Sequence, residues 1–427
     1  MAAKTNPKFV KEVIELTNKE RQKFGLSTLE SNGKLDTAAQ GHSKNMAVED
    51  FYSHRGQDGS YAGDRIDKAG YKAQTWGENI ATGQSTPHEI VEDWMDSRTH
   101  RGNILNPDYQ DIGVGYYYLK NDPGYYDYGS YWTQNFGTPE DGSDWWSKYQ
   151  NFDYGDEGND KLKGNKENDY LDGDEGNDTI TGAAGDDQLR GGQDGDFIKG
   201  GAGNDKIIGG EGFTCPTFRI YIQDSEDASD KLYGEDGNDL IQGDGGNDLV
   251  DGGKGKDILW GDDGNDTVLG MNDSDAISGG DGNDFLEGGK GNDALWGDEG
   301  TDTLIGVDAK NARPGQGERD TLTGGRSYYW GDGKDTFILG DGKTVYYDDG
   351  KNNNPGKGDY ALIRNFNADE DIIQLHGKAN DYALKNSPRG MPSGTAIFLD
   401  TAGKDELIGI VADVSDLDIK ADYFKFV

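Results

Sequence analysis

A nine-residue period governs the middle of this chain. Counting from Gly155, six units run to residue 208, and nine more run from residue 225 to residue 305. The eighth position of every unit is Leu, Ile or Val, and the sixth is always Asp. A flexible Gly/Asp linker would have no reason to keep two columns in phase over fifteen units. The period therefore predicts a repetitive, stacked fold.

Each unit joins a glycine-rich half, suited to a turn, to a short strand-like half with one aliphatic side chain. One unit cannot bury that side chain alone, so neighbouring units must stack into a solenoid. The pattern predicts a parallel β-roll in which two nonapeptides make one coil. Each turn then offers one Asp and several backbone carbonyls, and such hard oxygen ligands suit calcium better than zinc or copper.

The sixth-position aspartates are the predicted calcium ligands, with one omission. Asp230 is left out because its unit, SEDASDKLY, lacks the turn glycines. Glu167 and Asp273 also replace a glycine at the fourth position of their units, which weakens the prediction for the sites beside them. The predicted set is Asp160, Asp169, Asp178, Asp187, Asp196, Asp205, Asp239, Asp248, Asp257, Asp266, Asp275, Asp284, Asp293 and Asp302.

The charge of the chain is concentrated on the array and its flanks. Residues 1–140 hold 15 Lys/Arg and 20 Asp/Glu, a net of −5, so −34 of the total −39 lies in the remainder. Such a surface is a poor partner for nucleic acid or anionic membranes. Stacked carboxylates repel one another, so we expect calcium to act as a folding ligand. The single cysteine, Cys215, excludes an internal disulfide.

The array resembles the RTX (repeats-in-toxin) family across residues 155–305. That resemblance implies export by a type I secretion machinery, unfolded, with folding in calcium outside the cell. The first twenty residues contain no apolar signal core, and no stretch approaches the roughly 18 apolar residues of a membrane span. We therefore expect a secreted or cell-surface protein, exported without an N-terminal signal peptide and without a membrane span.

The N-terminal region carries a different set of motifs. They are HSKNM at 42–46, FYSHRGQDG at 51–59, GENIA at 77–81, WMDSRTHRGNILNPDYQDIGVG at 94–115 and YWTQNFG at 131–137. Together they resemble the bacterial branch of the CAP superfamily (cysteine-rich secretory proteins, antigen 5 and pathogenesis-related 1). The resemblance implies an α-β-α sandwich. Local patterns agree, with helices expected near 8–24, 34–50 and 86–98 and strands near 112–119 and 129–136.

CAP domains often place two histidines and two acids in a cleft, sometimes around zinc. By resemblance, His54 holds the first histidine position and Glu78 the first acidic one. The second acidic position falls on Ser97 and the second histidine position on Tyr131, so the family pattern is incomplete. His100 lies one turn beyond Ser97, and two imidazoles with one carboxylate would suit zinc with one position open. A metal-free hydrogen-bonded cluster of His54, Glu78 and His100 is the alternative.

The chain thus divides into a CAP-like domain (1–140), a linker (141–154), a calcium-binding β-roll (155–340) and a C-terminal region (341–427). The roll comprises the two blocks and partial repeats over 318–340. The last region is expected to be a small antiparallel β cap with a secretion role.

Three functions remain open for this arrangement. In the first, the roll displays the CAP domain for binding cell-wall glycan, lipid or a surface protein. In the second, the cleft is a metal-dependent hydrolase or protease. In the third, the protein is a structural component of an extracellular matrix or surface layer. The incomplete CAP pattern and the lack of a nucleophile motif such as GxSxG favour binding over catalysis.

Overall fold

The computed structural model describes residues 6–120, 128–140, 148–156, 158–210, 228–325, 333–348, 358–400 and 405–427. These residues form two compact units, the first ending at residue 140 and the second beginning at residue 148. Cys215 and residues 141–147 of the expected linker lie outside the described residues. Within the described ranges, no helix is both long and apolar enough to cross a membrane.

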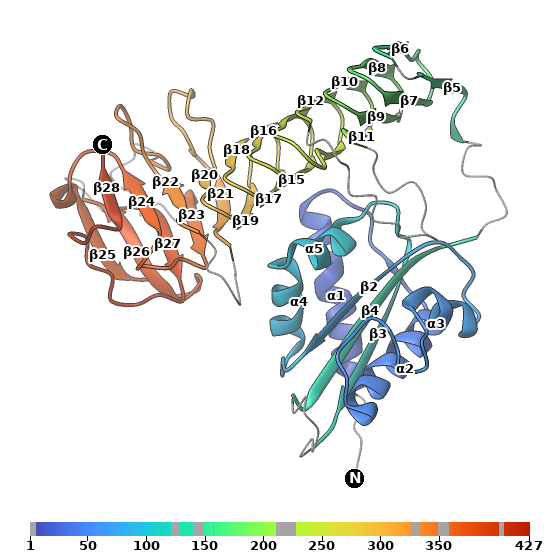
Figure 1. The fold of residues 1–427 in the computed structure, drawn as a ribbon. Coiled ribbons are helices and arrows are strands. Elements are labelled where there is room, and N and C mark those ends of the chain that lie inside the picture. Colours follow the sequence, from blue (N-terminus) through green and yellow to red (C-terminus); the bar gives the residue numbers. More distant parts are fainter. Residues whose placement is uncertain are drawn as a thin grey trace. The chain divides into compact units, whose positions relative to one another are not determined.

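The first unit is a four-stranded sheet between two layers of helices. Its helices are α1 (Pro7–Lys23), α2 (Gly33–Glu49), α3 (Ala62–Lys68), α4 (Pro87–Met95) and α5 (Arg98–Leu105), and its strands are β1 (Glu30–Ser31), β2 (Ala73–Thr82), β3 (Asp111–Tyr118) and β4 (Ser130–Pro139). The strand order is β1-β3-β4-β2, with β1 parallel to β3 and the other pairs antiparallel. Helices α2 and α3 cover one face, and α1, α4 and α5 cover the other (Figure 1). This is the α-β-α arrangement that the motifs predict.

Local sequence fixes where these helices begin. The side chain of Asn6 accepts a hydrogen bond from the backbone N–H of Lys8, and Pro7 occupies the first turn of α1. Thr86 and Glu89 form a reciprocal capping box before α4. Each cap satisfies backbone donors that have no partner inside the helix.

Two glycines let α2 lie directly on β3. A Cβ added to Gly113 would overlap the backbone of Leu35, and one added to Gly115 would overlap the backbone of Ala39. The GVG segment of β3 is therefore a close contact surface, where any side chain would push the helix away from the sheet.

The second unit consists mainly of short strands stacked in two parallel ladders. The strands are β5 (Asn151–Tyr154), β6 (Lys161–Lys163), β7 (Asp169–Glu175), β8 (Thr179–Ala184), β9 (Gln188–Gln193), β10 (Phe197–Ala202), β11 (Lys206–Ile208), β12 (Lys231–Asp236), β13 (Leu240–Gln242), β14 (Leu249–Lys254), β15 (Ile258–Asp263), β16 (Thr267–Asn272), β17 (Ala276–Asp281), β18 (Phe285–Lys290), β19 (Ala294–Glu299), β20 (Thr303–Ile305), β21 (Arg319–Thr323), β22 (Thr336–Ile338), β23 (Tyr360–Arg364), β24 (Ile372–Leu375), β25 (Tyr382–Asn386), β26 (Gly394–Leu399), β27 (Glu406–Ala412) and β28 (Phe424–Phe426). A short 3₁₀ turn, η2 (Ala379–Asp381), precedes β25.

Successive coils are related by eighteen residues. Thr179 in β8 pairs with Phe197 in β10, and Leu249 in β14 pairs with Thr267 in β16. Eighteen is two nonapeptides, so the predicted coil of two units is present. Alternate units belong to opposite sheets, one of eleven strands and one of thirteen. The eighth-position aliphatics form the continuous core between the sheets: Leu162, Leu171, Ile180, Leu189, Ile198, Ile207, Leu232, Ile241, Val250, Leu259, Val268, Ile277, Leu286, Leu295 and Leu304.

The first insertion leaves this register intact. Phe197 in β10 pairs with Lys231 in β12, and Lys206 in β11 pairs with Leu240 in β13, a step of 34 residues in both sheets. Subtracting one coil of eighteen leaves sixteen, the length of segment 209–224 between the two blocks. Sixteen residues are therefore added between the two blocks without changing the register, and the two blocks form one continuous roll.

The structure differs from the expected boundary at residue 340. Strands β23 and β24 continue the two parallel ladders, and β27 and β28 extend them by one more strand each. Among the described strands of this unit, only β25, β26 and β27 pair in antiparallel fashion. The C-terminal region is thus partly roll and partly cap, because its strand-like runs keep the parallel pairing after the nonapeptide spacing has ended.

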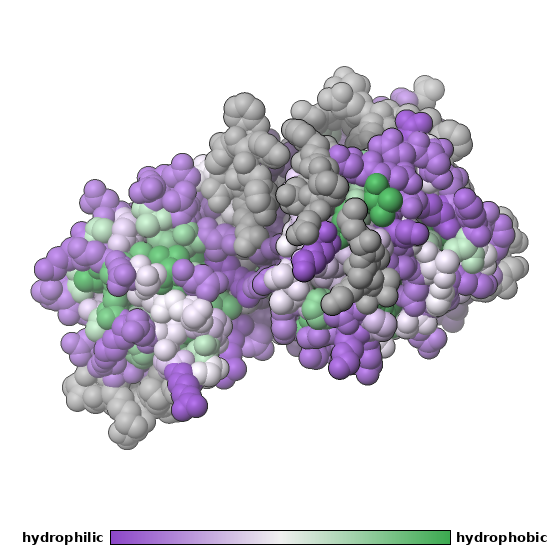
Figure 2. All heavy atoms as spheres, turned by 90° about the horizontal axis from the view of Figure 1, so that it is seen from below, coloured by the Kyte–Doolittle hydropathy of each residue, from purple (hydrophilic) through white to green (hydrophobic). Residues whose placement is uncertain are grey.

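The surface agrees with the low hydropathy of the chain. On the face drawn in Figure 2, hydrophilic residues dominate, and hydrophobic surface appears as interrupted patches. In the second unit the aliphatic residues of the repeats are used inside the narrow core.

We expect Gly115→Ala to destabilise the first unit by about 1–3 kcal/mol or more, because the added methyl group overlaps α2 backbone. Gly102→Ala is the matched control, since a Cβ there meets nothing within 4 Å. Thermal unfolding of the full chain, followed by helical circular dichroism, measures both. An equal loss of stability in the two variants would contradict the close-contact role of Gly115.

Candidate functional site

The aspartates of the repeats form two columns along the roll. In each column the backbone N–H of one Asp donates to Oδ1 of the Asp one coil later, as from Asp178 to Asp196 at 2.7 Å and from Asp187 to Asp205 at 2.9 Å. The first column contains Asp160, Asp178, Asp196, Asp230, Asp248, Asp266, Asp284, Asp302, Asp335 and Asp371, and the second contains Asp169, Asp187, Asp205, Asp239, Asp257, Asp275, Asp293 and Asp320. Every aspartate of the predicted set therefore lies in a column.

Sequence reasoning missed Asp230. Its side chain is buried, and it links Asp196 to Asp248 in the first column. Its own unit lacks glycines, but Gly209, the first residue of the insertion, lies against its Oδ2. The signal was present in the sequence as the glycine pair that opens the insertion. It was hidden because those glycines lie far from Asp230 along the chain.

The second carboxylate oxygen of many column members has no donor. Oδ2 is buried without a hydrogen-bond partner among the described residues in Asp178, Asp187, Asp196, Asp205, Asp239, Asp248, Asp257, Asp275, Asp293 and Asp302. Leaving a buried charged oxygen unpaired is costly, so this arrangement calls for a cation. At the start of the columns the pattern changes, because Oδ2 of Asp160 accepts from the N–H of Asp156 and Oδ2 of Asp169 from that of Asn165.

Most of these oxygens lie beside a carbonyl oxygen at a turn glycine. A Cβ built on Gly288 would lie 2.6 Å from Oδ2 of Asp293 and 2.6 Å from the carbonyl oxygen of Gly306. The same neighbours recur one nonapeptide earlier, in the other column, around Gly279, Asp284 and Gly297. Glycine is needed because any side chain would fill this small oxygen-lined space. A carboxylate and carbonyls with no donor form a donor set that fits calcium.

Burial and crowding raise the pKa of these carboxyl groups when no metal is present. Burial raises the pKa of Asp205 and of Asp239 to about 8, with like charges in the column adding to the rise. For Asp302 the same causes raise the pKa to about 9. A proton or a metal ion is thus required to neutralise the columns near neutral pH.

In the first unit, Glu78 is the centre of a buried charge cluster. Its Oε1 lies 3.0 Å from Nδ1 of His54, and Nη2 of Arg65 donates to both carboxylate oxygens at 2.9 and 2.8 Å. The Glu78 side chain is 2% exposed, Arg65 is 10% exposed and His54 is 51% exposed. Burial pushes the pKa of Glu78 up, but the hydrogen bond from His54 and the charge of Arg65 outweigh it, so the pKa lies below its usual value.

His42 and Arg65 belong to this cluster, although the sequence did not assign them to it. Nε2 of His42 lies 3.0 Å from the carbonyl oxygen of Ser53 and 4.0 Å from Oε1 of Glu78. Burial lowers the pKa of His42 to about 4, so the ring is neutral. The His42 ring is fully buried beside Glu78. No sequence motif identified Arg65, because its pairing with Glu78 depends on how α3 packs against β2.

Among the described residues, His100 shares no hydrogen bond or ion pair with this cluster, although the charge of His54 acts on its ring. His100 lies on α5, and its carbonyl oxygen accepts from Asn79 at 3.1 Å. Neighbouring strand residues point to opposite faces, so Asn79 and Glu78 face different helical layers. Burial, and then the charge of His54, lower the pKa of the His100 ring to about 4. Tyr131 is fully buried in an apolar cluster with Met46, Ala47, Phe51, Ile80 and Tyr117.

The zinc hypothesis for the cleft is therefore not supported. Across the part of the chain that the structure describes, no three His, Cys, Asp or Glu side chains are grouped to hold a metal. Glu78 already accepts from Arg65 and contacts His54, and a guanidinium beside its carboxylate repels a second cation. Of the metal-free alternative, the contact between His54 and Glu78 is present, and Arg65 takes part in it where His100 was expected.

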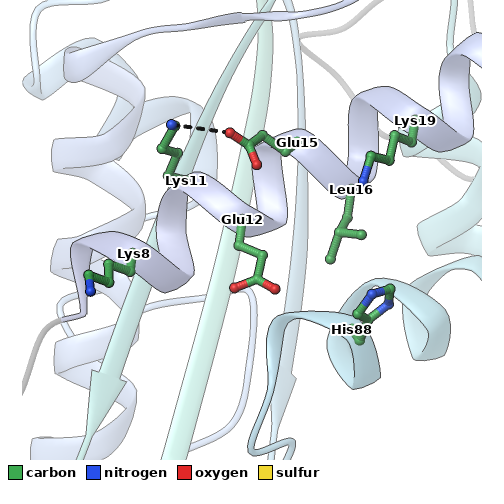
Figure 3. A pocket seen from close by; sticks show the side chains of 7 residues that line it. All are labelled: Lys8, Lys11, Glu12, Glu15, Leu16, Lys19 and His88. Atoms are coloured by element: carbon green, nitrogen blue, oxygen red, sulfur yellow. Dashed lines mark ion pairs between the residues drawn. The ribbon is translucent and has the colours of Figure 1, made fainter.

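A depression of about 290 Å³ lies elsewhere on this unit, between α1 and the start of α4 (Figure 3). It is lined by Lys8, Lys11, Glu12, Glu15, Leu16, Lys19 and His88. Lys11 and Glu15 form an exposed ion pair across its rim, and His88 is exposed. Long charged side chains on a helix surface explain this hollow, which does not include the Glu78 cluster.

The fold and the two sites describe a calcium-binding array joined to an α-β-α domain, and comparison with known proteins agrees. Residues 14–136 match the cysteine-rich secretory protein (CAP) family. Residues 154–189, 181–213, 226–259, 233–268 and 269–304 match the RTX calcium-binding nonapeptide repeat. The chain thus combines a CAP domain with RTX repeats, and the repeats indicate that it binds calcium.

Two curated relatives come from Bacillus subtilis (strain 168). The uncharacterized protein YkwD is 41% identical over 128 residues, which are 30% of this chain and 46% of YkwD. The uncharacterized membrane protein YlbC is 36% identical over 114 residues, which are 26% of this chain and 33% of YlbC. The chain therefore spans less than half the length of either relative.

Two solved structures each match about a third of the chain. One is an extracellular protein containing an SCP domain from Bacillus anthracis str. Ames, with 30% identity, a TM-score of 0.27, and coverage of 30% of this chain and 40% of that one. Another is an outer surface protein from Borrelia burgdorferi, with 18% identity, a TM-score of 0.29, and coverage of 32% of this chain and 99% of that one.

We expect Arg65→Ala to destabilise the CAP domain by about 3–5 kcal/mol, because it leaves the buried Glu78 carboxylate without its cation. Lys72→Ala, which breaks an exposed ion pair with Asp67, should cost less than about 1 kcal/mol. Thermal unfolding with calcium held constant gives both values. Similar small losses of stability in the two variants would show that the Arg65–Glu78 pair stabilises the domain no more than an exposed ion pair does.

The raised pKa values of the column aspartates predict a link between protons and calcium. In the metal-free roll these pKa values of about 8 exceed the unfolded value of about 3.9, so protonation stabilises this fold at low pH, and that stability is lost as pH rises through about 8. Chelated protein should therefore show more β circular dichroism at about pH 5 than at about pH 8. Calcium addition at about pH 5, where the protonated columns keep the chelated roll folded, should release protons, which a pH-stat measures. Calcium uptake with no proton release would contradict this link.

Proposed function

We propose that this protein is an extracellular calcium-binding protein in which calcium folds the roll and the roll displays the CAP domain to a ligand. The observation that carries the first half is the two columns of buried Asp Oδ2 atoms that have no donor among the described residues. A solenoid with one aliphatic residue per nonapeptide has a thin core. Burying so few aliphatic side chains does not offset the loss of chain entropy and the repulsion between the carboxylates of the columns. Folding therefore depends on the cation.

The calcium ligands in this proposal are the sixth-position aspartates of the fifteen full units, together with glycine carbonyls of the turns. Calcium supplies positive charge and a flexible oxygen coordination shell, which match carboxylates and carbonyls with no donor. Asp230 joins the predicted set because it lies in the first column. Extracellular calcium modules commonly bind at about 10⁻⁴–10⁻³ M, so the roll would stay unfolded in a calcium-poor cytosol and fold after export. Type I secretion of the unfolded chain agrees with that order.

The displayed site is the surface around His54. Its ring is half exposed, and the buried Glu78–Arg65 pair holds it in place. A fixed imidazole at the surface can donate or accept a hydrogen bond, which suits a polar extracellular ligand such as cell-wall glycan, lipid headgroup or surface protein. A purely structural matrix role would need no such held polar group.

One observation favours a second candidate, a hydrolase. Glu78 binds Nδ1 of His54, which is how a carboxylate orients a histidine that acts as a base through its other nitrogen. The cluster contains His42, His54, Arg65 and Glu78, and none of these side chains is a hydroxyl or thiol nucleophile. A positioned water would therefore have to be the attacking group.

The experiment uses the full chain with calcium or with chelator. Calcium should increase β circular dichroism, and the calcium-loaded protein should then co-sediment with one member of a panel of cell-wall glycan, lipid vesicles and immobilised surface protein. His54→Ala should abolish co-sedimentation while keeping the calcium response. His88→Ala, at an exposed histidine outside the Glu78 cluster, should behave like the parent protein.

Each result bears on one part of the proposal. No gain of β signal with calcium would overturn the folding role. Equal binding by His54→Ala and the parent would remove the surface around His54 as the ligand site. Hydrolysis of a panel member, lost in His54→Ala, would favour the second candidate, and calcium-driven sheets or fibres without binding would favour a structural role.

A further inference from the structure

The last aspartate of the second column, Asp320, differs from the one before it in what its Oδ2 contacts. Asp293 has a buried Oδ2 with no donor among the described residues, and the carbonyl oxygen of Gly306 lies across Gly288 from it. One coil later, Oδ2 of Asp320 accepts a hydrogen bond from the hydroxyl of Tyr347 at 2.7 Å. Both side chains are fully buried or nearly so.

Tyr347 takes the place of a carbonyl. The nearest atoms around a Cβ built on Gly288 are Oδ2 of Asp293 and the carbonyl oxygen of Gly306. Around Gly306 they are Oδ2 of Asp320 and the hydroxyl oxygen of Tyr347. A carbonyl can only accept, so it leaves the carboxylate needing a cation. A phenol hydroxyl can donate, so at Asp320 the protein supplies what calcium supplies in the preceding coils.

The backbone conformation of Tyr347 is independent evidence that the surrounding residues hold its side chain in this position. Its φ is 62°, in the left-handed region that a bulky aromatic residue rarely adopts. Such a conformation persists where the surroundings hold it. Here the backbone N–H of Tyr347 donates to the carbonyl oxygen of Pro314, and its ring lies against Gly315 and Val307.

The first column also ends on a protein donor. Oδ2 of Asp335 accepts from the backbone N–H of Gly325, and Oδ2 of Asp371 accepts from that of Asn367. Both columns therefore pass from aspartates that lack a donor to aspartates that have one. Of these donors, the Tyr347 hydroxyl belongs to a side chain, so it can be removed by substitution.

We propose that Tyr347 terminates the second calcium column, so that Asp320 is held by a hydroxyl instead of by calcium and the turn at Gly306 is formed without a cation. This inference rests on the proposed calcium role of the columns. Asp293 is then the last aspartate of this column that needs calcium. The following coil is held by the hydrogen bond between Tyr347 and Asp320, which does not depend on calcium.

Native mass spectrometry of the full chain in saturating calcium counts the bound ions. Asp320→Asn should leave the count unchanged, because Asn Oδ1 still accepts from the N–H of Asp293 and no ion is lost. Asp293→Asn, one coil earlier in the same column, should lose at least one ion. Loss of an ion in Asp320→Asn would overturn the inference.

A second variant tests the hydroxyl itself. Tyr347→Phe removes the donor and leaves the buried Asp320 carboxylate unpaired, so it should lower the thermal unfolding midpoint of the calcium-loaded chain, and adding Asp320→Asn should recover part of that loss. Tyr346→Phe is the matched control, since Tyr346 is also buried while Asp320 takes its phenol hydrogen bond from Tyr347. Equal midpoints for Tyr347→Phe and Tyr346→Phe would count against the proposal. A parent protein that binds no calcium would instead overturn the proposed function, so the two failures are distinguishable.

Discussion

The roll depends on the two carboxylate oxygens of its column aspartates, which make different contacts. Oδ1 of each column aspartate accepts the backbone N–H of the aspartate one coil earlier, which fixes the stacking at eighteen residues. In ten of these aspartates, Oδ2 of the same carboxylate is buried in the turn without a donor among the described residues, and in most of the ten a carbonyl oxygen lies beside it. The first oxygen is a structural bond that every coil makes for itself. The second is a buried acceptor that makes the whole stack conditional on a cation.

This division explains why the array tolerates interruptions. The N–H of Asp196 reaches Oδ1 of Asp230 across 34 residues, and that of Asp293 reaches Asp320 across 27. What the column requires is an aspartate at the right place in space, whatever the length of chain between coils. Loops can therefore be added outside the coil path at little cost, since the entropy of closing a loop grows slowly with its length. The same rule lets the parallel ladders run past the end of the nonapeptide spacing into β23 and β24.

The sequence predicted what periodicity controls and missed what only three-dimensional packing decides. The two-unit coil, the aliphatic core and the aspartate columns follow from spacing, because each repeat sees the same neighbours. Asp230 was missed because its partner glycine lies before the insertion. Arg65 and Tyr347 were missed because each reaches its carboxylate from a distant segment with no motif of its own. His100 was misplaced in the cleft because nearness along the chain to Ser97 does not reveal which face of the sheet a helix covers.

The two units answer the same physical problem in opposite ways. The CAP domain buries the carboxylate of Glu78 together with its own cation, Arg65, and the pKa of Glu78 falls below its usual value. The roll buries its carboxylates without a cation, and their pKa values rise to about 8. A site that carries its own guanidinium has no need of a metal, which is why the Glu78 cluster is a poor zinc site. A site that lacks one must take its cation from solution, and this is what makes the roll responsive to calcium. At Asp320 a third solution appears, in which a neutral hydroxyl replaces the ion and the response ends.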